Sequence, residues 1–150
     1  MTEEEFEKLW KDLVNRFFRN KSELTREELL FYAVNILRGS VPRSGFIGYF
    51  ENNEGPTIMA AKEGLMEMNL QTGLKILEIA QEIIMGDSPL PTDDKPIMLL
   101  PHDTEEQYKK ACEKLEFALH KVEKDFYEYE EKLWEGLLNY ASDNQLKPRD

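Results

Sequence analysis

The feature that most constrains the fold is a long apolar stripe in the last third of the sequence. From Tyr108 to Tyr140, apolar residues recur at alternating steps of four and three: Tyr108, Cys112, Leu115, Leu119, Val122, Phe126, Tyr129, Leu133, Leu137 and Tyr140. Such steps place side chains on one face of an α-helix. With Asp103 and Glu106 forming an acidic capping pair, the stripe predicts one helix over 103–140, about 57 Å long. A helix of that length either bends around a core, projects at one end or packs against a partner.

The same periodicity predicts further helices in the rest of the chain. Phe6 to Phe17 form an amphipathic pattern, and Thr25 with Glu28 forms a capping box for a second helix that Gly39 would end. Two more helices are expected over 57–68 and 70–85. The apolar stretch 45–50 predicts a short buried helix entered through a tight turn, with a strand as the alternative. The predicted fold is therefore all-α, a compact bundle of about five or six helices with a long C-terminal helix.

The domain organisation follows from length and from the breaks between helices. A chain of 150 residues fits one domain, 1–150, with its core at about 5–141. Four prolines between 87 and 102 exclude a helix there and predict a surface loop, held down by the apolar residues 97–100. The polar tail 143–150 is expected to fray.

The charge balance limits the kinds of partner. Thirty acids oppose nineteen bases, giving −11, which disfavours direct binding to nucleic acid or to an anionic membrane surface. The first fifty residues are neutral, so the acidity belongs to the remaining two thirds of the chain. The acidic start and the lack of a long apolar run predict a cytoplasmic protein without a membrane segment.

A search for catalytic and metal-binding patterns gives none. His102 and His120 stand alone, eighteen residues apart, without the further ligands that a zinc site needs. Cys112 lies on the apolar stripe, which indicates a buried structural thiol rather than a nucleophile. We therefore expect no enzyme activity, no cofactor and no metal. An enzyme of unrecognised type would most plausibly use the region of Arg43, Tyr49 and Asn52.

The charges along the last predicted helix are segregated. On a helical wheel with Asp103 at the origin, the apolar stripe centres near about 130° and one flank spans about 180–320°. That flank has a net charge of −6, because two lysines offset eight glutamates, whereas the other flank is +1. We call these glutamates the acidic strip: Glu105, Glu106, Glu113, Glu116, Glu123, Glu130, Glu131 and Glu135. It is either an ordinary solvated face or a docking strip for a basic partner.

One segment carries a family resemblance. Residues 43–50, Arg-Ser-Gly-Phe-Ile-Gly-Tyr-Phe, followed by Asn-Asn-Glu-Gly at 52–55, resemble the N-G-G-F-x-Q-Y-F and N-S-x-G pattern of a bacterial domain-of-unknown-function family that includes a DNA-mimic protein. The matching positions are Gly45, Phe46, Tyr49, Phe50, Asn52 and Gly55. Arg43, Ser44 and Gly48 depart from the pattern, which leaves the aromatic, packing half of the motif.

The resemblance implies an all-α fold and, from its DNA-mimic member, an acidic homodimer that binds a DNA-binding protein in place of DNA. The leading hypothesis is thus a protein-interaction module whose acidic strip binds a basic protein, in particular a nucleic-acid-binding one. An immunity or antitoxin-like protein is a second interpretation. A structural domain whose acidic face only confers solubility is the third.

Overall fold

The computed structural model describes residues 1–95, 97 and 104–149. Within those residues it contains six α-helices and one short 3-10 turn, and the all-α prediction is confirmed. The elements are α1 (Glu3–Asn20), η1 (Lys21–Glu23), α2 (Arg26–Asn52), α3 (Gly55–Glu67), α4 (Gln71–Met85), α5 (Glu105–Glu128) and α6 (Glu130–Asp143). None of the described helices is long and apolar enough to cross a bilayer.

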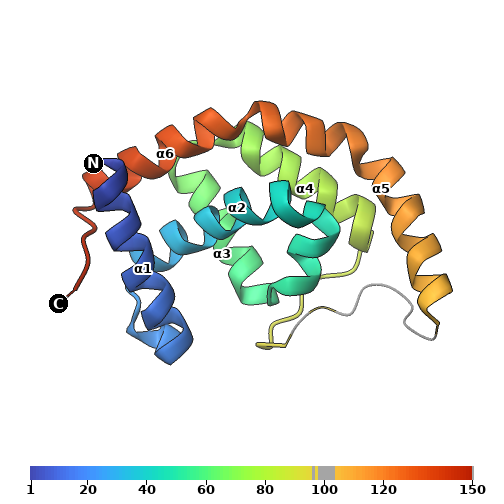
Figure 1. Ribbon diagram of the computed structural model, residues 1–150, viewed down its shortest axis with the longest axis horizontal. Helices are drawn as coiled ribbons and strands as arrows, with labels where there is room; N and C mark the ends of the chain where they lie inside the picture. The colour runs from blue at the N-terminus through green and yellow to red at the C-terminus, as the bar shows by residue number, and fades with distance from the viewer. Residues whose placement is uncertain (96, 98–103, 150) are drawn as a thin grey trace.

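The helices are arranged around α2, as Figure 1 shows. Helices α5 and α6 form an arc along one side of the molecule, in contact with α2 and α4. Helix α1 and both chain ends lie at the opposite end from the start of α5. The arrangement leaves the first turns of α5 at the edge of the bundle.

Side-chain caps begin three of the helices. Thr2 and Thr25 each form a complete capping box, the second with Glu28 as the sequence predicts. The predicted cap of the last helix, Asp103, lies outside the described residues, as does His102. The observed cap is Thr104, whose hydroxyl accepts from the Gln107 backbone N–H at 3.0 Å.

The prediction of one uninterrupted C-terminal helix is wrong. The chain leaves the regular helix at Tyr129, whose backbone N–H is shared between the carbonyls of Asp125 and Phe126 at 3.2 and 3.1 Å. The resulting α6 has only 14 residues. The buried side chains nevertheless continue the stripe across the break, from Phe126 to Leu133. Of the three arrangements open to a long helix, the chain adopts a bend that keeps one face against the core.

The predicted end of the second helix at Gly39 is also wrong. Helix α2 continues through Gly39 and Pro42 to Asn52, with a kink at Gly45. Its buried residues lie on all sides, because it runs through the middle of the bundle. Burial on this scale outweighs the local stop signals, and Pro42 is tolerated on the exposed side.

The loop and the tail are both held to the helices. Ile97 is buried, as predicted for the surface loop, while Met98 to Leu100 lie outside the described residues. A Cβ at Gly55 would overlap the Pro91 carbonyl, so this part of the loop lies directly on the start of α3. The tail was expected to fray, whereas the structure places residues 144–149 against α1 and α2 through hydrogen bonds of Arg149.

Candidate protein-interaction surface

The structure places most of the acidic strip at the surface. Six of its eight side chains are exposed: Glu105, Glu106, Glu113, Glu116, Glu131 and Glu135. The other two, Glu123 and Glu130, are half-buried and make contacts within the fold. The strip that can face a partner is therefore smaller than the sequence suggests, and its exposed glutamates lie on the first half of α5 and the first turns of α6.

Glu130 is neutralised by a cation from α2. Arg38 donates to its carboxylate at 2.7 Å and to the Asn35 side chain at 2.9 Å. The same guanidinium lies over the Trp134 ring, 4.7 Å from its centroid. Glu130 thus joins α6 to α2, and it contributes little negative charge to a docking surface.

Glu123 lies against the kink of α2 at Gly45. Gly45 has φ 70° and ψ 179°, a backbone conformation that essentially only glycine adopts. The Phe46 backbone N–H faces the Glu123 carboxylate of α5 and lowers the pKa of that group. A Cβ at Gly45 would lie 3.3 Å from Glu123 Oε2. The Glu123 carboxylate therefore lies directly against the kink of α2.

The environment of Glu123 also changes its acidity. Burial raises the pKa of its carboxyl group above the ordinary value, and the negative charge of Glu116 adds to the rise. The Phe46 N–H, His120 and the Tyr127 hydroxyl lower it, but do not cancel the increase. The fold thus holds the Glu123 side chain in a place where its ionised form is destabilised.

The other motif residues are structural as well. Phe46 packs edge-on against Phe126 of α5, with ring centroids 5.5 Å apart. Tyr49 and Phe50 are completely buried, and burial raises the pKa of the Tyr49 phenol. Asn52 is exposed at the end of α2.

An enzyme of unrecognised type was expected to use the region of Arg43, Tyr49 and Asn52. Tyr49 is fully buried, whereas Arg43 and Asn52 are both exposed. The three side chains therefore do not face one common surface. Among the described residues, no group of three or more histidine, cysteine, aspartate or glutamate side chains is arranged to hold a metal ion.

Cys112 is only partly buried, and it lies beside Tyr108 on α5. Burial raises the pKa of its thiol, and the negative charges of Glu51, Glu116 and Glu113 act in the same direction. Tyr108 in turn donates to Glu51 at 2.8 Å, which joins the first turns of α5 to the end of α2.

A surface hollow joins the motif to the acidic strip. It has a volume of about 310 Å³ and lies between the kink of α2 and the middle of α5. Its lining consists of Ser44, Gly45, Ile47, Glu116, His120 and Glu123. Glu116, His120 and Glu123 follow one another at helical steps of four and three, so they form one face of α5.

Among the described residues, the most exposed large apolar side chain directly follows Glu116 of this hollow in the sequence, and the sequence analysis did not identify it. Phe117 of α5 is 88% exposed. By helical geometry it points about 190° away from the centre of the apolar stripe, and Glu113 lies one turn before it. A phenylalanine on the polar side of the wheel was the signal that could have revealed it. Phenylalanine is among the residue types enriched in protein interfaces.

Fold and surface together define a small, acidic, all-helical domain whose edge helix carries glutamates and one bare aromatic side chain. The family model of DMP19-like protein matches residues 22–144, which is most of the chain. The chain belongs to that family, whose namesake is a DNA mimic protein. Comparisons with curated proteins and with solved structures gave no match.

Proposed function

We propose that the outer face of α5 binds a basic protein of the DNA-binding kind, with Phe117 as the apolar anchor and Glu113 and Glu116 as charged contacts. The observation that carries the proposal is the exposure of Phe117, 88%, on the turns that also bear exposed glutamates. Burial of an exposed aromatic side chain by a partner contributes a large part of the free energy of binding. The family membership supports the same class of partner.

The charge density of this face determines how strongly electrostatic attraction contributes to binding the partner. Duplex DNA carries about one charge per 1.7 Å of its axis. Glu106 and Glu116 are ten helical steps apart, or about 15 Å along the axis, with Glu113 between them. Three charges over that length are far fewer than DNA would present. The partner is therefore held by a few ion pairs around an apolar contact, and not by a full copy of a phosphate backbone.

Capture of the partner from an extract of the source cells tests the anchor. The immobilised chain is compared with Phe117→Ala and with Phe18→Ala, whose side chain is 78% exposed on α1. Loss of an anchor contact costs about 2 kcal/mol or more, so Phe117→Ala should weaken capture by at least about thirtyfold. Phe18→Ala should capture as the wild type does. Equal capture by all three proteins would refute the anchor.

A second pair of variants tests the glutamates. Glu113→Gln with Glu116→Gln should weaken capture, and the effect should shrink as salt rises towards 0.5 M, because exposed charges are screened. The matched control is Glu78→Gln with Glu82→Gln, which removes two exposed charges from α4. If both double variants weaken capture equally, the effect comes from net charge and not from this surface.

A further inference from the structure

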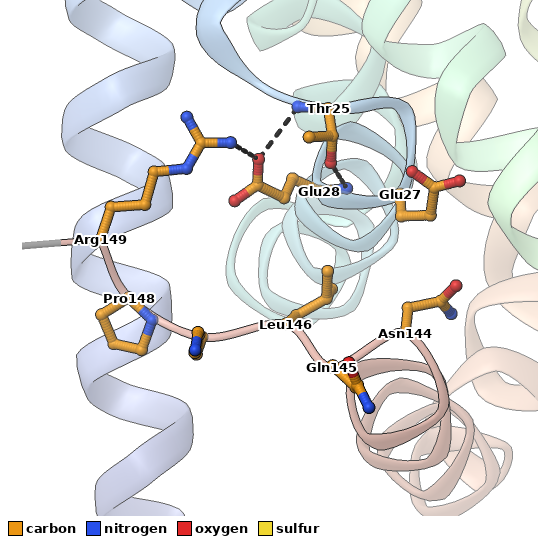
Figure 2. A pocket seen from close by; sticks show the side chains of 9 residues that line it. Thr25, Glu27, Glu28, Asn144, Gln145, Leu146, Pro148 and Arg149 are labelled. Atoms are coloured by element: carbon orange, nitrogen blue, oxygen red, sulfur yellow. Dashed lines mark hydrogen bonds and ion pairs between the residues drawn. The ribbon is translucent and has the colours of Figure 1, made fainter.

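The segment after α6 lies as a strap across the start of α2 and the side of α1 (Figure 2). It leaves α6 through Gln145, which has a positive φ of 52°. The Leu146 backbone N–H donates to the Ala141 carbonyl at 2.9 Å, and its side chain packs against the core. Beyond Leu146 the chain runs outward to Arg149, whose backbone N–H and guanidinium donate to the groove beneath the strap.

Arg149 is held by a site of several groups. Its Nη2 donates to Glu28 Oε1 at 2.9 Å, and its Nη1 to the Glu23 carbonyl at 3.4 Å. Its backbone N–H donates to Asp12 Oδ2 at 3.1 Å. Dashed lines in Figure 2 show that the Arg149 guanidinium and the Thr25 N–H both donate to the same Glu28 oxygen. The groove thus binds both the backbone and the guanidinium group of Arg149.

The groove beneath the strap has an unbalanced negative charge when Arg149 is not counted. Asp12 and Glu28 share one buried cation, Arg16, which donates to both carboxylates. The Glu28 side chain is only 6% exposed. Burial alone would raise the pKa of Glu28, but the hydrogen bonds from Arg16 and Thr25 and the charges of Arg16 and Arg149 hold it below its ordinary value. Two carboxylates against one guanidinium leave one charge for a second guanidinium to neutralise.

The strap does not fill the groove. A hollow of about 570 Å³ remains, lined by Thr25, Glu27, Glu28 and residues 144–149. The strap carries two basic side chains, Lys147 and Arg149, and Arg149 is half exposed. Its release would uncover the Glu28 carboxylate and leave the groove with one carboxylate charge that Arg16 does not neutralise.

We propose that this groove is a binding site for an arginine-bearing extended segment of a basic partner protein, and that the strap is its internal competitor. Charge complementarity selects that occupant, because the groove already accepts the guanidinium of Arg149, and a basic segment of a partner offers the same group. The groove lies at the opposite end of the molecule from the start of α5. Binding of a segment in this groove therefore does not depend on the surface around Phe117.

The test is a titration of the full-length chain with a blocked peptide of sequence Asn-Gln-Leu-Lys-Pro-Arg, the strap itself. Calorimetry compares the wild type with Arg149→Ala, which removes the strap's guanidinium from Glu28 and leaves Arg16 in contact with Asp12 and Glu28. Arg149→Ala should bind the peptide at least tenfold more tightly than the wild type, in which the strap competes. Lys147→Ala is the control and should behave as the wild type does. A peptide with lysine in place of arginine should lose at least tenfold.

Other outcomes overturn the proposal. Equal binding to the wild type and to Arg149→Ala would mean that the peptide binds elsewhere, and absence of binding to Arg149→Ala would mean that the groove accepts no segment in trans. A wild-type dimer that dissociates on Arg149→Ala substitution would assign the groove to a second copy of the chain. None of these results bears on capture through Phe117.

Discussion

Replacing Gly45 by alanine is the sharpest test of the link between the family motif and α5. The conformation at φ 70° and ψ 179° costs a residue with a side chain about 1–3 kcal/mol. The new Cβ would lie 3.3 and 3.4 Å from the two Glu123 carboxylate oxygens, which must then move away from the Phe46 N–H. We expect Gly45→Ala to lower the free energy of unfolding by about 2 kcal/mol after the smaller entropy of the unfolded alanine chain is included.

Gly39 provides the matched control on the same helix. It is exposed, it has helical geometry, and a Cβ there would meet nothing within 4 Å. Gly39→Ala should therefore stabilise the protein by about 0.5–1 kcal/mol, because glycine is a poor helix former. Thermal unfolding followed by circular dichroism should show a fall of about 4–8 °C for Gly45→Ala and a rise of about 1–4 °C for Gly39→Ala. An unchanged or higher unfolding temperature for Gly45→Ala would refute the reasoning.

Three further predictions concern stability and pH, each measured by urea unfolding. The pKa of Glu28 is lower in the folded state than in the unfolded state, where it is 4.5. The stabilising contribution of Glu28 to the free energy of unfolding is therefore complete above pH 4.5 and is lost as the pH falls through the folded pKa. The wild type should lose stability on acidification to about pH 3 more steeply than Glu28→Gln does. The pKa of Glu123 is higher in the folded state than in the unfolded state, so the wild type should lose stability as the pH rises from 4.5 through the folded pKa. Glu123→Gln should remove this loss. A steeper loss of stability in the variant would contradict the raised pKa. Gln145→Gly should stabilise the chain by up to about 1 kcal/mol by relieving a left-handed residue at a helix end, and a decrease would show that Gln145 is not strained.

Helix positions could be predicted from the sequence because periodicity and capping are local signals. The Thr25 capping box lies where the pattern places it, and α4 ends at Met85, as predicted for the helix over 70–85. Gly39 failed as a stop because the residues around it, such as Leu37 and Val41, are buried in the centre of the bundle, and only the tertiary structure shows that. The break at Tyr129 is a consequence of curvature over neighbouring helices, which a continuous stripe does not encode.

The candidate surface was only partly predictable for the same reason. The helical wheel placed Glu123 and Glu130 among the exposed glutamates, but their partners, the Phe46 N–H and Arg38, come from α2 and are distant in sequence. The contacts of the strap are equally non-local, since Arg149 reaches a glutamate 121 residues earlier in the chain. Phe117 was visible on the wheel and was missed because the search followed charge alone.

We propose that a basic, DNA-binding protein binds the α5 face around Phe117. The most direct measurement is competition: the captured partner is purified, bound to the chain, and challenged with duplex DNA at constant salt. If the partner is of the proposed kind, DNA should displace it in proportion to its own affinity, and the Phe117→Ala variant should be displaced at about thirtyfold lower DNA concentration. A complex that saturating DNA leaves intact, and that Phe117→Ala does not weaken, would contradict the account.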